Sequence, residues 1–270
     1  MTIRTALAQG TELLARDGIT APRLTAEVLL AHAMRCDRSY FYAHPEQDLR
    51  EVEWIHYGRY LHERIKGKPT QYITRRQEFY GREFRVTPAV LIPRPETELL
   101  VETTLKIARG LVVDVGTGSG AIAVTLALGS RARVIAADLS AEALIVAKAN
   151  AEALGAQVSF IEADLLQPFA CASADLIVSN PPYIPLNAEL QREVRDHEPH
   201  LALFAGVSGL EIYRRLIPEA HRVLKPGGTL ALELGFGLAE AATTLVSEWK
   251  GVEVLPDLAG IPRVLVCEKP

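Results

Sequence analysis

The chain has 270 residues, of which 49% are hydrophobic, and this length is comfortable for two domains. No apolar run approaches the roughly 18 to 20 residues that a membrane span needs, and the N-terminus lacks a signal-peptide pattern, so we expect a cytoplasmic protein that does not associate with membranes. The formal net charge of −4 disfavours a nucleic-acid substrate, although a local basic face is compatible with it. Three widely spaced cysteines argue against a disulfide framework or a zinc site.

Residues 1–67 predict helices only. Apolar positions of the first helix are Ile3, Leu7, Leu13 and Leu14, and those of a second, opened by Pro22, are Leu24, Val28, Leu29 and His32. A third helix follows Asp48 and Glu51, which resemble a capping box, and ends near Gly67; its expected apolar stripe comprises Val52, Ile55, Leu61 and Ile65. The histidines of this region have no metal-ligand spacing, and we expect no metal.

Residues 68–92 predict a β-hairpin linker, because aromatic and β-branched residues surround Gly81. The next string, residues 91–98, places Pro95 at a first helical position and acidic residues at the positive end of a helix. Helix capping alone accounts for this string, and a site role for Arg94 and Glu96 is the alternative. The predicted domains are therefore 1–67, 68–92 and 93–270.

From residue 111 onward the pattern alternates between strands and helices. Strands are expected at 111–115, 133–137, 158–163, 174–179 and 229–234, with helices at 121–128, 141–154, 210–224 and 238–249. Two last strands, 252–254 and 263–267, are too close in sequence for a crossover helix and should be antiparallel. The predicted fold class is α/β: a Rossmann-like, mostly parallel sheet with an antiparallel last strand, preceded by a small all-helical domain.

Polar and glycine residues follow successive strands of this predicted sheet, and ligands bind beyond the carboxyl ends of such strands. Gly116 to Gly120 let the backbone approach a ligand closely, and Asp138, 22 residues after Gly116, is placed to accept hydrogen bonds from ribose hydroxyls. Asp164 is placed to accept from an adenine amino group, with Leu165 packing on the base. These residues predict an adenosine-containing cofactor, although an aspartate after a strand also commonly caps a helix.

The glycine loop does not define the cofactor by itself. Its spacing is G-x-G-x-G, and Ala121 stands where the dinucleotide fingerprint has its last glycine, which disfavours a nicotinamide cofactor. Asn180-Pro181-Pro182-Tyr183 closes a buried strand and presents an amide side chain, unpaired carbonyls and an aromatic face. Such a group suits the binding of a planar, neutral NH2 group, because two acceptors take its hydrogens while a ring packs on its plane.

Two motifs resemble those of class I S-adenosylmethionine-dependent methyltransferases that methylate amino groups on planar systems: Asp114-Val115-Gly116-Thr117-Gly118-Ser119-Gly120 and Asn180-Pro181-Pro182-Tyr183. The narrower resemblance is to the release factor glutamine methyltransferase (PrmC/HemK) family, and it covers nearly the whole chain. It rests on the Ile-Pro-Arg-Pro-Glu-Thr string at 92–97, His197-Glu198-Pro199 and the closing Asp257-Leu258-Ala259-Gly260. Small departures occur at 207–208 and 261–263, away from the matched site.

The resemblance implies methyl transfer from S-adenosylmethionine, leaving S-adenosylhomocysteine, to the side-chain amide nitrogen of the glutamine in the Gly-Gly-Gln loop of peptide chain release factors. It implies a cofactor site at Gly116, Thr117, Gly118, Ser119, Gly120, Asp138, Asp164, Leu165 and Asn180. Catalytic roles fall to Asn180, Pro181 and Tyr183, and substrate binding to Asn180, Pro181, Pro182 and Tyr183.

Three alternatives remain open at this point. The first is an amino methyltransferase acting on adenine or guanine of DNA or RNA, which would want a basic face and a target-recognition insertion that the chain does not display. The second is a nucleotide-dependent oxidoreductase, and the third a non-enzymatic binding module. We expect a monomer whose partner is a release factor rather than nucleic acid. The helical domain is expected to hold this large substrate, or otherwise to serve as a stabilising cap.

Overall fold

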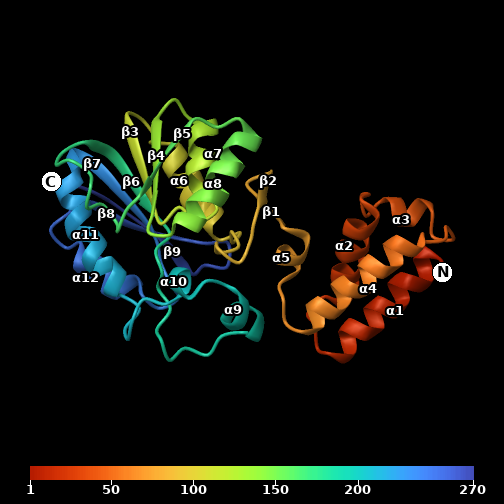
Figure 1. Cartoon of the computed structure of the whole chain (residues 1–270). Helices are drawn as coiled ribbons and strands as arrows, with labels where there is room; N and C mark the ends of the chain where they lie inside the picture. Colours follow the sequence, from red (N-terminus) through yellow and green to blue (C-terminus); the bar gives the residue numbers. More distant parts are fainter. The chain divides into compact units, whose positions relative to one another are not determined.

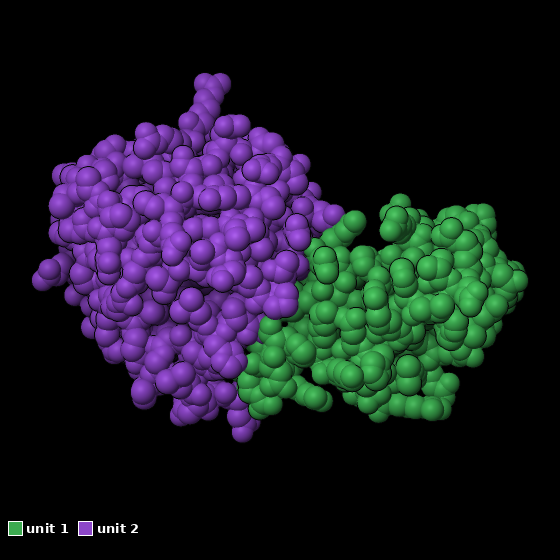
Figure 2. Space-filling model, viewed as in Figure 1, with its two compact units in different colours: residues 1–76, 190–197 green, residues 77–189, 198–270 purple.

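A computed structural model describes residues 1–270 and divides them into two compact units. The helical unit comprises residues 1–76 and 190–197, and the sheet unit comprises residues 77–189 and 198–270 (Figure 2). No helix combines the length and the apolar character needed to cross a membrane. The domain boundaries proposed from the sequence stay a prediction.

The helical unit is built from short helices packed around one apolar core. Ile3, Leu14, Leu29 and Leu30 are fully buried in this core, together with the ring of Tyr57. Residues 190–197 contribute to the same unit, and Glu193 forms an ion pair with Arg64. The helices are α1 (Ile3–Arg16), α2 (Pro22–Met34), α3 (Tyr40–Ala43), α4 (Glu51–Ile65), α5 (Thr70–Thr74) and α9 (Arg192–His197) (Figure 1).

Two predictions about α4 were wrong, the second only in part. Its N-terminus is capped by the Glu53 carboxylate, which accepts a hydrogen bond from the backbone N–H of Arg50 at 2.8 Å, and not by the pair Asp48 and Glu51. Val52 and Ile55 of the predicted apolar stripe are exposed, whereas Leu61 of the same stripe is buried, next to Tyr57 and Arg64. Because aromatic and charged residues share the buried face, counting aliphatic residues alone located that face only in part.

The predicted hairpin is present as β1 (Arg76–Phe79) and β2 (Arg82–Arg85). Tyr80 and Gly81 form its turn with φ values of 51° and 68°, which is the geometry of a tight type I′ connection. Phe79 and Phe84 are both buried, with their ring centroids 6.0 Å apart in an edge-to-face arrangement. The hairpin is therefore attached to the core of the sheet unit.

The main sheet has seven strands in the order β5-β4-β3-β6-β7-β9-β8, and its first five strands are parallel neighbours. The last two strands are antiparallel, as predicted. The strands are β3 (Leu111–Val115), β4 (Arg133–Asp138), β5 (Val158–Glu162), β6 (Ala174–Ser179), β7 (Leu224–Glu233), β8 (Lys250–Pro256) and β9 (Pro262–Glu268). The expected turn at 225–228 lies inside β7, where the pairing with β6 shifts register.

Helices cover both faces of this sheet (Figure 1). Val112, Leu176 and Val178 point to the face covered by α6 (Thr97–Leu105), α7 (Ala121–Gly129) and α8 (Ala141–Leu154). Val113 and Ile177 point to the opposite face, which is covered by α11 (Glu211–Val223) and α12 (Ala239–Leu245). A last short helix, α10 (His200–Leu203), precedes α11. This arrangement confirms the predicted Rossmann-like α/β fold and explains why the central strands are apolar on both sides.

Candidate active site

The candidate site lies where the strand order reverses. The chain runs outward from β3 through β4 to β5 and then returns to place β6 on the other side of β3, so the crevice between these directions is a topological switch point. Val115 of β3 pairs with Ala137 of β4 and with Ser179 of β6. The residues that directly follow these three paired positions therefore lie at the same edge of the sheet: Gly116, Asp138 and Asn180.

A cavity of about 380 Å³ opens at this edge, which is within the usual size of small-molecule sites. Seven of the predicted site residues line it: Gly116, Gly118, Asp138, Asp164, Leu165, Asn180 and Pro182. The other five do not line it: Thr117, Ser119, Gly120, Pro181 and Tyr183. The remaining wall is mostly apolar and includes Val90, Leu91, Leu139, Pro199, Leu201 and Ile212.

The glycine loop forms one wall through bare backbone. Gly116 and Gly118 have φ values of 73° and 54°, and a Cβ added at either would meet no protein atom within 4 Å. Behind them, the buried Asp114 carboxylate accepts hydrogen bonds from the Thr117 hydroxyl at 2.6 Å and from the Ala123 backbone N–H at 3.1 Å. Burial raises the pKa of Asp114 to about 7, and these two hydrogen bonds oppose that rise. Thr117 therefore holds the shape of the loop rather than facing the cavity.

Asp138 connects the end of β4 to this loop through hydrogen bonds. Its carboxylate accepts hydrogen bonds from the backbone N–H groups of Gly118 at 2.8 Å and Ser140 at 2.9 Å. Burial raises the pKa of Asp138, and the backbone hydrogen bonds oppose this by favouring the ionised form. A carboxylate offers about four acceptor positions, so two remain for a ligand in the cavity.

Asp164 and Leu165 follow β5 and also line the cavity. Asp164 Oδ2 accepts a hydrogen bond from Arg215 Nη2 of α11 at 2.6 Å. Leu165 has a φ of 53°, which is strained for a branched residue and places its side chain at the wall. Arg215 carried no recognisable signal in the sequence, because its role depends on α11 packing beside the end of β5.

Asn180 lies at the end of β6 with one end of its carboxamide engaged. Its Nδ2 donates a hydrogen bond to Thr97 Oγ1 at 3.1 Å. Neither Asn180 Oδ1 nor the carbonyl of Pro181 accepts a hydrogen bond from another group of the protein. These two acceptors therefore have no partner within the protein, and Asn180 itself lines the cavity.

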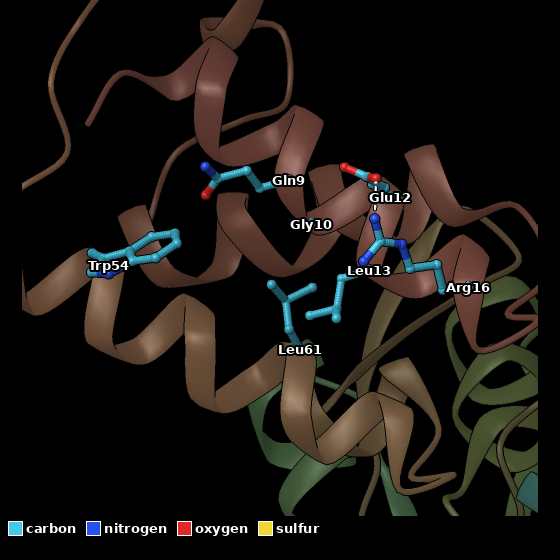
Figure 3. A pocket seen from close by; sticks show the side chains of 7 residues that line it. All are labelled: Gln9, Gly10, Glu12, Leu13, Arg16, Trp54 and Leu61. Carbon is cyan, nitrogen blue, oxygen red and sulfur yellow. Dashed lines mark hydrogen bonds and ion pairs between the residues drawn. The ribbon is translucent and has the colours of Figure 1, made fainter.

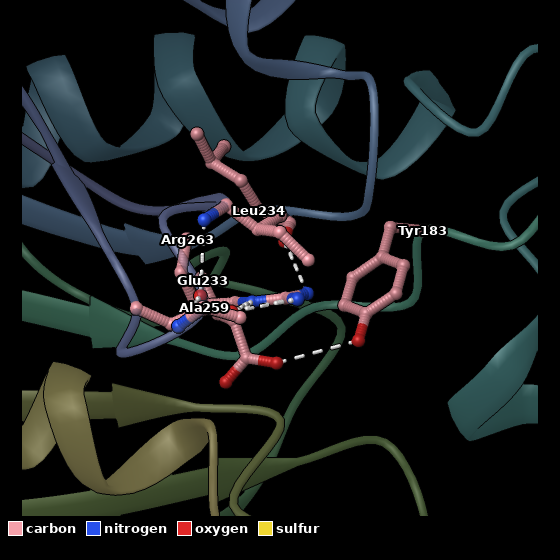
Figure 4. A network of polar contacts seen from close by, with 7 residues as sticks. Tyr183, Glu233, Leu234, Ala259 and Arg263 are labelled. Atoms are coloured by element: carbon pink, nitrogen blue, oxygen red, sulfur yellow. Dashed lines mark hydrogen bonds and ion pairs between the residues drawn. The ribbon is translucent and has the colours of Figure 1, made fainter.

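Tyr183 belongs to a buried polar network at the ends of β7 and β9 (Figure 4). Its hydroxyl donates a hydrogen bond to Glu233 Oε1 at 3.3 Å, and Arg263 pairs with Asp257 at 3.1 Å beside it. The ring packs against Gly235, where an added Cβ would lie 2.7 Å from Tyr183 Cδ2. Burial raises the pKa of Tyr183, and the nearby Glu233 contributes to this rise, so the hydroxyl stays protonated. The hydrogen bond to Glu233 and the contact with Gly235 together fix the position of the ring.

Arg94 anchors the segment that follows β6. Its guanidinium pairs with Glu198, whose other oxygen accepts from the Ile92 backbone N–H at 3.2 Å. Glu198 is 4% exposed, and the adjacent Pro199 lines the cavity. Glu96, the other residue considered for a site role, is exposed at the N-terminus of α6. The Ile-Pro-Arg-Pro-Glu-Thr string and His197-Glu198-Pro199, distant in sequence, are thus joined.

Asn150 is a structural residue of the site that the sequence did not reveal. This buried side chain on α8 donates to the backbone carbonyls of Ser119 at 2.8 Å and Arg85 at 3.0 Å, and accepts from the Arg85 N–H at 2.8 Å. It therefore joins the glycine loop to the hairpin. An asparagine among alanines inside a helix was the only available signal.

A smaller cavity of about 240 Å³ lies in the helical unit between α1 and α4 (Figure 3). Its walls are mainly the hydrocarbon parts of Leu13, Trp54 and Leu61, and its charged residues, Glu12 and Arg16, pair with each other. It lacks strand ends and a glycine loop, so the larger cavity is the candidate active site.

The residues of the larger cavity fit an adenosine-containing cofactor. The bare backbone at Gly116 and Gly118 leaves room for close contact, Asp138 offers acceptors for hydroxyl groups, and apolar side chains form much of the wall. This combination is the one expected for S-adenosylmethionine.

Solved structures resemble this chain in fold. A methyltransferase from Pyrococcus furiosus superposes with a TM-score of 0.55 at 20% identity, covering 71% of this chain and 90% of the other. The 16S rRNA N2 G1207 methyltransferase of T. thermophilus, solved with AdoMet and guanosine, superposes with a TM-score of 0.56 at 22% identity, covering 72% of this chain and 50% of the other. Together with the sheet order and the glycine-walled cavity, these likenesses define a class I methyltransferase fold.

Sequence comparisons identify the family of this chain more narrowly than the fold does. The PrmC N-terminal domain model matches residues 5–74, and the methyltransferase small domain model matches residues 95–195. A release factor glutamine methyltransferase from Koribacter versatilis is 46% identical over 278 aligned positions, covering 100% of this chain and 99% of its own. The enzyme of that name from Bacillus subtilis is 44% identical and covers 89% of each chain. The chain belongs to the release factor glutamine methyltransferase family.

Proposed function

We propose that this protein transfers a methyl group from S-adenosylmethionine to the side-chain amide nitrogen, N5, of the glutamine in the Gly-Gly-Gln motif of peptide chain release factors. The observation that carries this proposal is the pair of free acceptors, Asn180 Oδ1 and the Pro181 carbonyl, beside the cofactor-sized cavity. Full-length similarity to enzymes named for this reaction supports the choice of substrate.

Bound S-adenosylmethionine supplies a methyl group activated by its sulfonium centre. The protein must bring a poor nucleophile to that group, because the lone pair of an amide nitrogen is delocalised. Asn180 Oδ1 and the Pro181 carbonyl would accept the two amide hydrogens. These hydrogen bonds would fix the plane of the amide and stabilise the positive charge that develops on nitrogen. Tyr183 would pack on that plane, since its hydroxyl and ring are held by Glu233 and Gly235.

Each predicted cofactor residue has a role consistent with its position. Gly116 and Gly118 would contact the cofactor through backbone, Asp138 would accept from the ribose hydroxyls, and Leu165 would pack on the base. Asp164 would address the adenine amino group with Oδ1, because its Oδ2 is bonded to Arg215. Thr117, Ser119 and Gly120 would act indirectly by keeping the loop in shape.

The helical unit would contribute to binding the large protein substrate, so free glutamine and short peptides should react poorly. Its purely helical construction and match to the PrmC N-terminal domain model support this role. Loss of the unit would then raise KM for a release factor more than for a short peptide.

The test uses methyl-labelled S-adenosylmethionine with three separate substrates: a release factor, the same factor with its loop glutamine changed to alanine, and duplex DNA. Label only in the intact factor supports the proposal, and mass spectrometry would place the added methyl on the glutamine side chain. Label in DNA, or equal label in the alanine variant, would refute it and favour the amino methyltransferase alternative.

A further inference from the structure

The proposed chemistry places a strict demand on Asn180, because the two ends of a carboxamide have opposite hydrogen-bonding character. Oδ1 can accept a substrate N–H, whereas Nδ2 can only donate. A reversed carboxamide would present a donor to the substrate NH2 group and would oppose binding. Something must therefore determine which end faces the substrate.

Thr97, the last residue of the Ile-Pro-Arg-Pro-Glu-Thr string, contacts the carboxamide directly. Its Oγ1 lies 3.1 Å from Asn180 Nδ2, and the residue is 4% exposed at the start of α6. A hydroxyl both donates and accepts, so Thr97 alone would be compatible with either orientation of Asn180. The direction of its single O–H decides between them.

Glu233 supplies that direction. It is 1% exposed at the end of β7, a strand that packs against α6, and the neighbouring Thr97 hydroxyl opposes the rise that burial causes in the pKa of its carboxyl, which favours the ionised form. An ionised carboxylate has no proton to donate, so an interaction between the two groups requires the Thr97 O–H to point toward it. The Thr97 oxygen then has only lone pairs to offer Asn180, and Nδ2 must turn toward Thr97.

The surroundings of Glu233 fit a role beyond packing. Its Oε1 accepts from the Tyr183 hydroxyl, while its Oε2 is buried without a hydrogen-bond partner and is therefore the acceptor available to the Thr97 O–H. The same carboxyl therefore bonds to Tyr183, next to the predicted substrate position, and lies close enough to influence Thr97, which holds Asn180. A buried acceptor left unpaired is costly to stability, which is typical of a group kept for function.

We propose that Thr97 and Glu233 are positioning residues that hold the carboxamide of Asn180 with Oδ1 toward the substrate amide. This inference rests on the proposed function. Thr97 acts through Asn180, and Glu233 acts through Thr97 and Tyr183; neither needs to touch the substrate.

The arrangement has a pH-dependent consequence. Burial raises the pKa of Glu233 to about 7, so both of its forms exist near neutrality. The groups that face it are Thr97 and Glu96 from the start of α6, Tyr183 after β6, Arg263 of β9 and Tyr213 of α11, whose hydroxyl donates to the Glu233 backbone carbonyl. A protonated Glu233 can donate to Thr97, which lets the Thr97 hydroxyl donate to Oδ1 and the carboxamide reverse.

The test compares Thr97→Val, Thr97→Ser and Glu233→Gln with the wild-type protein in methylation of an intact release factor. Thr97→Val removes the hydroxyl at nearly constant shape and should lower kcat about 10- to 100-fold, the cost of a lost buried hydrogen bond expressed as a rate. KM for the factor and Kd for S-adenosylmethionine should change by no more than about threefold, because only the orientation of the reacting amide is affected. Thr97→Ser should retain most of the activity.

Thr104→Val is the matched control. Thr104 is fully buried on the same helix, and its hydroxyl bonds only to backbone carbonyls, that of Leu100 at 2.7 Å and that of Val101 at 3.1 Å. This variant should keep wild-type kcat. Glu233→Gln should lower kcat and remove the rise in kcat that the wild-type protein shows as pH increases through about 7.

Unchanged kcat in Thr97→Val, or loss of cofactor affinity in proportion to turnover, would overturn the inference. So would a pH profile in Glu233→Gln that matches the wild type. Failure of the wild-type protein to label the release factor while it binds S-adenosylmethionine would instead refute the proposed function, and with it the basis for this inference.

Discussion

The glycine loop permits a sharp test of the cofactor site through Gly118→Ala. Gly118 has a φ of 54° and lines the cavity, and an added Cβ would meet no protein atom within 4 Å. The fold should therefore lose only the cost of a left-handed alanine, about 1 kcal/mol, or about 2–4 °C in Tm. The added methyl group would occupy space that the cofactor needs. Overpacking of this kind costs about 1–3 kcal/mol, which corresponds to a rise of roughly 5- to 150-fold in the Kd for S-adenosylmethionine.

Gly155→Ala provides the control. Gly155 caps α8 with a φ of 72°, an added Cβ there also meets nothing within 4 Å, and the residue does not line the cavity. Both variants should show the same small loss in Tm by calorimetry, but only Gly118→Ala should lose affinity for S-adenosylmethionine by titration calorimetry. Equal affinity in the two variants would refute the assignment of this loop to the cofactor. A much larger loss of Tm in Gly118→Ala would mean that the loop is essential to the fold itself.

Three further predictions concern other parts of the sheet unit. Asn180→Ala should lower turnover far more than the affinity for S-adenosylmethionine, measured by single-turnover kinetics and calorimetry; equal losses would contradict the proposed amide contact. Asp114 and Glu233 have folded-state pKa values raised to about 7 by burial, so the fold is more stable when each is protonated. As pH rises from about 4 to 8, this stability is lost, by up to about 4 kcal/mol for Asp114 and about 3 kcal/mol for Glu233. Urea unfolding of the cofactor-free protein between pH 5 and pH 8 should detect this, and Asp114→Asn with Glu233→Gln should flatten the dependence; an unaltered slope would show that neither group carries it. Arg94→Ala leaves the buried Glu198 carboxylate without its cation and should cost about 2 kcal/mol of stability and weaken cofactor binding, because Pro199 beside it lines the cavity; wild-type Tm and Kd would exclude this anchoring role.

The order of strands and helices in the sheet unit followed from local pattern. The strands at 111–115 and 174–179 were predicted with their observed bounds, because both are apolar runs ended by glycine or proline. Prediction was weaker for the helical unit, where α4 buries a face containing Tyr57, Glu53 and Arg64. Which face of such a helix is buried depends on its neighbours, and an aliphatic count carries no information about them.

The sequence by itself determined the residues that a cofactor and an amide would meet: glycines after one strand, an aspartate after the next and Asn180 after another. Their convergence follows from parallel strands ending at one edge, which is a general property of this fold. Only the tertiary structure decided what supports them. Thr97 lies beside Asn180, Glu233 beside Thr97 and Tyr183, and Arg215 beside Asp164, and each pair joins segments at least 50 residues apart. Such pairings depend on side-chain packing between distant elements, for which neither periodicity nor motif spacing holds a signal.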